Sequence, residues 1–195
     1  MIATPQSSNL TPEEYLQLEA NSDIKHEYIN GEVYAMAGAT DTHVTIAGNI
    51  FALLLSHLRG SGCRVYISDM KVRIENKNRF YYPDVLVTCE NRDRENNTFK
   101  KFPNLIIEVL SDSTEAFDRG DKFADYQSLP SLQEYVLVNT RKTRIECFRR
   151  TKEDLWLLQF YEIKDSHFEL TSINFKGNIS DVYEEVEFSN KQPNS

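Results

Sequence analysis

The segment from residue 105 to residue 110, Leu-Ile-Ile-Glu-Val-Leu, constrains the fold of this chain more than any other. A nearly continuous apolar run of this kind is typical of a strand that is buried on both faces. Glu108 interrupts the run, and an ionised carboxylate there is costly unless it is paired, neutralised or bound to a metal. We therefore expect a covered sheet with an acidic group inside it.

The patterns around this strand predict helices and further strands. Thr11 and Asp41 are the expected N-caps of helices over residues 11–21 and 41–60, and a third helix is expected over 118–129. The Asn30-Gly31 pair predicts a hairpin turn between two short strands. Strands are expected at residues 26–29, 32–36, 63–75, 80–90, 104–110, 134–139, 144–150 and 155–161.

This order of elements predicts an α/β (α+β) fold, in which helices flank a mixed β-sheet after an N-terminal helix and hairpin. Residues 91–101 are expected to form an exposed loop, and the pattern is weaker from residue 162 onward. With 195 residues and no repeat or linker, we expect a single domain over 1–195. Residues 190–195 are expected to be a disordered tail.

The net charge of -8 is distributed unevenly along the chain. Residues 1–42 and 153–195 each carry -6, whereas residues 43–152 carry +4. Alternating strands can present the bases of the middle part as a stripe facing phosphate, or these bases can be solvated charges beside turns. They are Arg64, Lys71, Arg73, Lys77, Arg79, Arg141, Lys142, Arg144, Arg149, Arg150 and Lys152.

Several well-known site patterns are absent from the sequence, which contains no GxxxxGK[ST], HExxH or GxSxG. Cys63, Cys89 and Cys147 are far apart and form no CxxC pair, so we expect buried, reduced thiols. No apolar run approaches the roughly 20 residues of a membrane span, and the polar N-terminal segment does not resemble a signal peptide. A cytoplasmic protein without membrane contact is therefore expected.

Two acids inside apolar strands are the strongest candidates for chemistry. Asp84 precedes Val85-Leu86-Val87, and Glu108 lies within the run described above. If these strands are neighbours, both carboxylates can share a pocket with a Mg²⁺ ion, which prefers oxygen ligands. The alternative is an exposed Asp84 at a sheet edge and a Glu108 that is paired with a buried base.

The helix that follows offers a base, because Asp118, Lys122 and Tyr126 are four residues apart and share one face. Lys122 could orient an attacking water or neutralise charge on a phosphoryl group, or it could form an ordinary surface pair with a neighbouring acid. His43, at the start of the long helix, is a further candidate for the pocket, although a single histidine is more often structural.

Taken together, these segments resemble the Uma2 family (DUF820) of restriction-endonuclease-like proteins. This family is a branch of the PD-(D/E)XK nuclease superfamily and is plentiful in cyanobacteria. The resemblance covers most of the chain, from about residue 11 to about residue 186. It rests on residues 28–32, His43, and residues 66–73, 82–85, 107–111, 118–122 and Tyr126.

The resemblance implies that Asp84 and Glu108 bind the metal together with the backbone carbonyl of Val109. The usual superfamily lysine is missing, because Leu110 stands two residues after the second acid. In similar branches this lysine has moved to the next helix, which nominates Lys122. Asp84, Glu108, Lys122 and His43 are then the expected catalytic residues.

We therefore expect an endonuclease that uses Mg²⁺ or Mn²⁺ to hydrolyse DNA phosphodiester bonds. Lys71, Arg73 and Arg119 are the residues expected to contact DNA. A homodimer is also expected, because nucleases often pair to cut two strands and the strands near 144–161 leave an edge to cover. The alternative is a catalytically inactive interaction or accessory protein derived from a mobile element, which the net negative charge favours.

Overall fold

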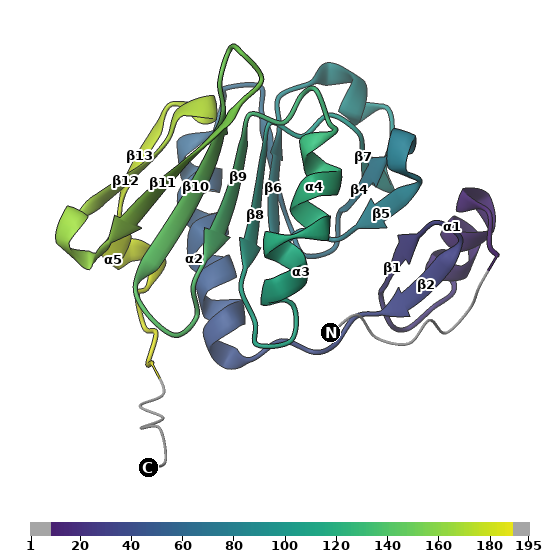
Figure 1. Cartoon of the computed structure of the whole chain (residues 1–195), viewed down its shortest axis with the longest axis horizontal. Helices are drawn as coiled ribbons and strands as arrows, with labels where there is room; N and C mark the ends of the chain where they lie inside the picture. The colour runs from purple at the N-terminus through teal and green to yellow at the C-terminus, as the bar shows by residue number, and fades with distance from the viewer. Residues whose placement is uncertain (1–8, 189–195) are drawn as a thin grey trace.

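The computed structural model describes residues 9–188, and the predicted tail at 190–195 lies outside the described residues. The larger sheet has six strands, namely β3 (Arg64–Ile67), β6 (Val85–Thr88), β8 (Leu105–Val109), β9 (Glu134–Val138), β10 (Arg144–Arg150) and β11 (Trp156–Glu162). Their order in space is β11-β10-β9-β8-β6-β3 (Figure 1). The pair β8 and β9 is parallel and the other neighbours are antiparallel, which confirms the predicted mixed sheet.

The smaller sheet has five strands in the order β2-β1-β5-β4-β7. They are β1 (His26–Ile29), β2 (Glu32–Ala35), β4 (Lys71–Ile74), β5 (Arg79–Tyr81) and β7 (Phe99–Lys100). Asn30 and Gly31 join β1 to β2 with φ angles of 52° and 96°, the positive values that a tight hairpin turn needs. Helix α1 (Pro12–Ala20) begins at Thr11 with a capping box and places Tyr15 against this sheet. The predicted N-terminal helix and hairpin are confirmed.

Helices cover both faces of the larger sheet (Figure 1). On one face lie α2 (Asp41–His57), the two-stranded sheet of β12 (His167–Leu170) and β13 (Phe175–Asn178), and α5 (Ile179–Val182). On the other face lie α3 (Glu115–Arg119) and α4 (Asp121–Gln127). Short 3-10 helices occur at Glu75–Lys77, Asn91–Arg94, Ile163–Asp165 and Thr171–Ile173.

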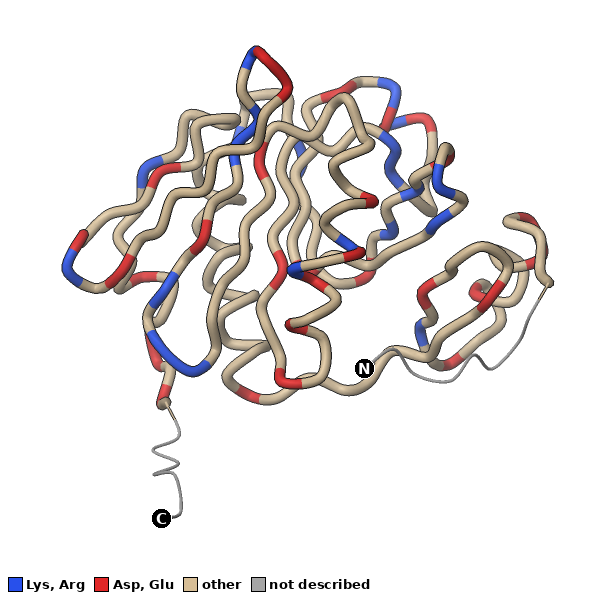
Figure 2. Tube along the Cα trace, viewed as in Figure 1, with Lys and Arg blue, Asp and Glu red and all other residues tan. Residues whose placement is uncertain are grey.

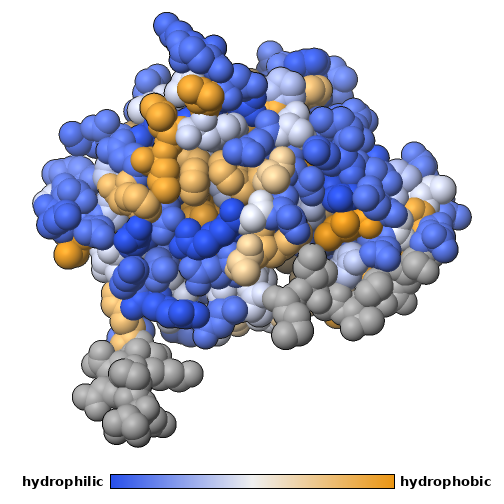
Figure 3. Space-filling model, viewed as in Figure 1, coloured by the Kyte–Doolittle hydropathy of each residue, from blue (hydrophilic) through white to orange (hydrophobic). Residues whose placement is uncertain are grey.

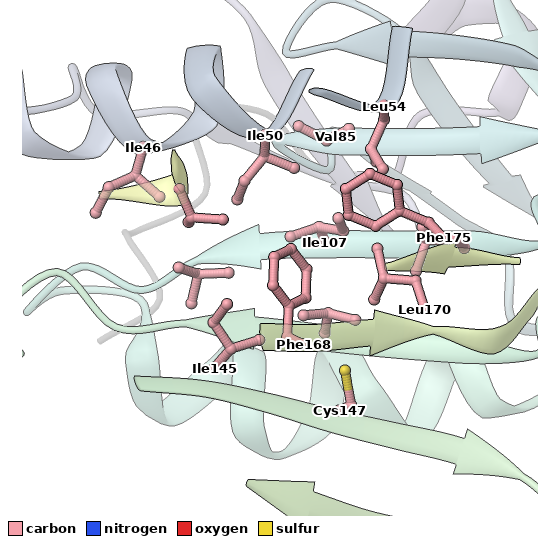
Figure 4. Packing of buried hydrophobic residues seen from close by; sticks show 14 of the residues in the cluster. Ile46, Ile50, Leu54, Val85, Ile107, Ile145, Cys147, Phe168, Leu170 and Phe175 are labelled. Atoms are coloured by element: carbon pink, nitrogen blue, oxygen red, sulfur yellow. The ribbon is translucent and has the colours of Figure 1, made fainter. Parts of the chain in front are cut away.

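The core between α2 and the sheet follows the helical spacing of the sequence. Ile46, Ile50 and Leu54 lie on one side of α2 and point toward Val85 and Ile107 of the sheet (Figure 4). All five side chains are buried. Burial of each such side chain stabilises the fold by about 1.5–3 kcal/mol, so this contact fixes β6 and β8 against the helix.

The predicted strands at 63–75 and 80–90 are wrong as continuous strands. Each run is divided, so that β3 and β6 belong to the larger sheet while β4 and β5 belong to the smaller one. The first run breaks at Ser68, whose φ is 49° and whose N–H donates to the carbonyl of Asp84 at 2.9 Å. The chain therefore passes twice between the two sheets next to Asp84.

Three smaller expectations also need correction. Residues 91–101 are not a simple exposed loop, because they contain a 3-10 helix and β7, and they bury Asp93 and Lys100. Lys100 Nζ donates to the carbonyl oxygen of Asp93 at 2.7 Å. The helix predicted over 118–129 begins earlier, at Glu115, and is divided at Gly120 into α3 and α4. The N-cap of α2 is Thr40 rather than the predicted Asp41.

The expectation of three reduced cysteines is wrong. Cys63 and Cys89 form a disulfide, whereas Cys147 is a free, buried thiol whose pKa is raised to about 12 by burial. The register of β3 and β6 pairs Arg64 with Thr88, and the next pair outward is Cys63 and Cys89. The disulfide therefore closes the end of the β3–β6 ladder.

The basic residues are concentrated on one of the two sheets. Lys and Arg gather on the smaller sheet, on and around β4, β5 and β7 (Figure 2). This distribution agrees with the basic middle part of the sequence. Within residues 9–188, no helix combines the length and apolar character that crossing a membrane requires.

Candidate active site

Asp84 and Glu108 come together because their strands are neighbours. Val85 pairs with Ile107 in the antiparallel ladder of β6 and β8, and continuing this register by one residue places Asp84 opposite Glu108. Residues that are directly opposite point to the same face of a sheet. Asp84 is fixed further by the N–H of Val109, which donates to Asp84 Oδ2 at 2.7 Å.

Lys122 from α4 reaches the same place. Its Nζ lies 2.9 Å from Glu108 Oε1, 3.1 Å from Glu27 Oε1 and 3.5 Å from Asp118 Oδ1. Both Lys122 and Glu108 are buried. Glu108 is therefore paired with a buried base, which was one of the alternatives from the sequence. It also lies close to Asp84.

The charged groups in this cluster lie close enough to shift one another's pKa values. Burial alone would lower the pKa of Lys122, but Glu108, Glu27 and Asp118 together hold that pKa well above its usual range. Burial raises the pKa of Glu108, and the nearby carboxylates of Asp118 and Asp84 raise it further, against the opposing effect of Lys122. The ammonium thus stays charged and compensates several crowded carboxylates.

Glu27 is a further member of the cluster; from the sequence alone it is equally well explained as a possible site carboxylate and as a solvated acid beside the hairpin turn. In β1, His26 and Tyr28 are buried on one face, so Glu27 points the other way, toward Lys122. The N–H of Tyr82 also donates to Glu27 Oε1, at 3.5 Å. Burial raises the pKa of Glu27, although Lys122 opposes this shift. Strand alternation places Glu27 on the opposite face from His26 and Tyr28, but only the structure shows that this face contacts Lys122.

His43 stands on the other side of Asp84. It lies in the first turn of α2, and its Nε2 is 3.3 Å from Asp84 Oδ2. Burial lowers the pKa of His43, but the hydrogen bond and charge of Asp84 outweigh this effect and raise it overall, with a smaller contribution from the backbone of Val109. Asp84 therefore lies between an imidazole and a backbone N–H.

Tyr126 is a further residue in contact with Glu108. Its Oη donates to Glu108 Oε1 at 3.4 Å, and burial raises the pKa of this phenol well above its usual range. Tyr126 therefore acts as a neutral hydrogen-bond donor to Glu108.

The donor set fits a hard divalent cation. Within residues 9–188, Asp84 Oδ1 and Glu108 Oε2 have no hydrogen-bond partner, so each carboxylate keeps one oxygen uncommitted. No group of three His, Cys, Asp or Glu side chains in that range is arranged to hold a metal. One or two carboxylates, with water and substrate oxygens in the remaining positions, are typical of Mg²⁺.

The three bases predicted to contact DNA differ in their surroundings. Lys71 Nζ donates to Tyr82 Oη at 3.0 Å, and Arg73 donates to Asn78 Oδ1 and lies over the ring of Phe80. Among the described residues, neither base has a carboxylate within ion-pair distance, and burial lowers the pKa of both.

Arg119 is paired more tightly than Lys71 and Arg73. Its two terminal nitrogens donate to Glu146 at 2.6 and 3.0 Å, and its Nε donates to Glu115. The predicted contact of Arg119 with DNA therefore has to compete with two carboxylates.

Comparison with known proteins identifies the family. The model of the Uma2 family, described as "Putative restriction endonuclease", matches residues 12–174. This chain belongs to the Uma2 family. The match includes every residue of the cluster described above.

Two relatives from the cyanobacterium Synechocystis sp. PCC 6803 cover most of the chain. Protein slr1290 is 40% identical over 179 residues, which make up 92% of this chain and 94% of the relative. Protein sll1609 is 34% identical over 160 residues, which make up 81% of this chain and 90% of the relative. Both are called uncharacterized proteins.

A solved structure shares the fold. The crystal structure of a DUF820 protein from Anabaena variabilis, described as a putative nuclease, matches with a TM-score of 0.74 at 15% identity. The match covers 89% of this chain and 97% of that protein. At this level of identity, the likeness establishes the fold alone.

Proposed function

We propose that this Uma2 protein is an endonuclease that hydrolyses DNA phosphodiester bonds with the help of Mg²⁺ or Mn²⁺. The observation that carries the proposal is the convergence of Asp84 and Glu108 from neighbouring strands, with Lys122 Nζ 2.9 Å from Glu108 Oε1. Two carboxylates and a buried ammonium at the end of a sheet suit phosphoryl chemistry better than any other chemistry supported by the sequence.

The metal would be held by Asp84 Oδ1, Glu108 Oε2 and the carbonyl oxygen of Val109. When bound, the ion would activate water and offset charge on the phosphate. The chain itself fixes the two carboxylates, because Val109 N–H and His43 hold Asp84 while Lys122 and Tyr126 hold Glu108. Both uncommitted oxygens are therefore preorganised.

Lys122 and His43 would act on the substrate side of this site. The Lys122 ammonium is held charged by three carboxylates, so it can stabilise negative charge that develops on a phosphoryl group. His43 would orient Asp84 and, when protonated, donate a hydrogen bond to a phosphate oxygen.

We propose that DNA is held by Lys71 and Arg73, with Arg119 as a further contact. Support for the first two comes from their freedom from ion pairs among residues 9–188 and from the basic character of the smaller sheet (Figure 2). We further propose a cytoplasmic homodimer as the working form, because cutting both strands of a duplex takes two sites.

Nicking of supercoiled plasmid DNA tests the proposal. We expect nicking in millimolar Mg²⁺ or Mn²⁺, none with a chelator, and none by an Asp84→Asn variant, while an Asp112→Asn variant remains active. Asp112 is the control because it is also an aspartate but pairs with Arg141 at the surface. Its side chain is far more exposed than that of Asp84. Cleavage by Asp84→Asn at the rate of the parent protein would overturn the proposal.

A second candidate function is that of an interaction or accessory protein that keeps the nuclease fold without activity. The net charge of -8 favours it, because a surface rich in acids repels the DNA backbone. This candidate predicts that plasmid DNA is not nicked in the presence of either metal. It also predicts that the chain binds no metal.

A further inference from the structure

Strand β11 ends the larger sheet with an apolar edge. Residues 157–160 are all exposed, and the large apolar side chains in and beside the strand stay in solvent, namely Leu155, Leu157, Leu158, Phe160 and Ile163. The surface over β10 and β11 is correspondingly hydrophobic (Figure 3). Soluble proteins usually protect such an edge with a charge, a proline or a bulge, because an open strand can pair with another strand.

The backbone of β11 shows which groups are available at this edge. Thr151 N–H donates to the carbonyl of Leu155, so Thr151 and Leu155 form a hydrogen-bonded pair in the β10–β11 hairpin. Such pairs alternate along an antiparallel ladder, which turns the N–H and C=O groups of Trp156, Leu158 and Phe160 outward. Within residues 9–188, the outward groups of these three residues have no hydrogen-bond partner.

Glu162 supports this assignment of inward and outward groups. It continues the outward series, and its N–H donates to Asp165 Oδ2 at 2.8 Å instead of to β10. The free part of the edge therefore ends at Phe160. The three free residues are symmetric about Leu158, with one on each side at a distance of two positions.

This symmetry indicates which strand would pair with the free edge of β11. A second copy of β11 that runs antiparallel about a two-fold axis at Leu158 would satisfy all three outward residues at once, by pairing Trp156 with Phe160 of the partner subunit. The paired side chains of Trp156, Leu158 and Phe160 would be apolar, and on the other face Leu157 would lie opposite Gln159 of the partner subunit. An unrelated charged peptide would leave these apolar side chains without matching partners.

We propose that the chain dimerises by antiparallel pairing of its β11 strands about Leu158, which joins two six-stranded sheets into one. The proposal does not depend on catalysis. The two candidate active sites would lie on the same face of the joined sheet, eight strand spacings or about 40 Å apart, so both stay open to substrate.

Sedimentation velocity over about 1–100 µM protein tests the pairing, because an interface of one strand is smaller than a standard one and should be concentration-dependent. We expect a dimer for the parent chain and a monomer for Leu158→Lys. Leu55→Lys is the matched control, since Leu55 on α2 is 40% exposed and Leu158 is 42% exposed. A monomeric parent chain, or a dimer that survives Leu158→Lys, would overturn the proposal.

Cysteine crosslinking tests the register independently of any loss of folding. A Leu158→Cys variant would place two thiols at the two-fold axis and should form a covalent dimer on oxidation, because a hydrogen-bonded pair has a Cα separation of about 5.5 Å. A Leu155→Cys variant should stay monomeric on denaturing gels, since its copies would be about 20 Å apart. Equal crosslinking of the two variants would contradict the register.

Discussion

Lys122 Nζ lies 2.9 Å from Glu108 Oε1, and this buried pair joins α4 to the central strand β8. Glu27 and Asp118 surround the same ammonium from β1 and α3. The Lys122 ammonium therefore connects strands of both sheets and helices α3 and α4 at the candidate active site. We therefore expect removal of this charge to affect folding as well as the proposed chemistry.

Replacement of Lys122 by Met should lower the free energy of unfolding by about 3–5 kcal/mol, because it leaves buried carboxylates without their counter-charge. Urea denaturation in the presence of a chelator measures this change. Lys164→Met is the control, since Lys164 is exposed and pairs only at the surface. A Lys122→Met protein as stable as its parent would show that the cluster is not held together by this charge.

The pair of Arg119 and Glu146 should make stability depend on pH. Burial raises the pKa of Glu146, but the hydrogen bonds and charge of Arg119, with a further contribution from Arg144, outweigh it, so the pKa is lowered overall from 4.5. The stabilisation is therefore present above pH 4.5 and is lost as the pH falls through the lowered pKa.

Glu146→Gln should consequently cost about 1.5–3 kcal/mol near neutral pH, the usual range for hydrogen bonds to charged groups, and less in acid. Thermal unfolding at a series of pH values gives the difference from the parent. Exposed Glu153→Gln serves as the control. A constant difference across the acid range would rule out this linkage.

Reduction of the Cys63–Cys89 disulfide should destabilise the chain by about 3.5 kcal/mol, on the entropic account of closing a loop of this length. The bond closes a sequence separation of 26. Denaturation with and without dithiothreitol measures the effect, and a Cys63→Ser/Cys89→Ser variant should lose its sensitivity to reductant. Unchanged stability on reduction would mean that the ladder of β3 and β6 needs no covalent closure.

Local patterns predicted the elements that depend on neighbouring residues. The hairpin at Asn30 and Gly31, the helix with Ile46, Ile50 and Leu54 on one face, and the antiparallel pair β10 and β11 all follow from turn chemistry or periodicity. The break at Ser68 is different, because it depends on a hydrogen bond to Asp84, which is distant in sequence.

The candidate site was only partly predictable for the same reason. Asp84 and Glu108 could be singled out as acids in apolar strands, but Glu27 could not be separated from a solvated acid without the partner of β1. Likewise, Cys63 and Cys89 become neighbours only through the register of β3 and β6. Composition and spacing carry no information about that register.

Calorimetric titration of the chain with Mg²⁺ and Mn²⁺ tests the central claim most directly. We expect binding in the parent protein, loss of binding in both Asp84→Asn and Glu108→Gln, and retention in Glu32→Gln, whose carboxylate contacts Tyr34 away from the site. Absence of binding at millimolar metal, or full binding in both site variants, would contradict a cation shared by Asp84 and Glu108.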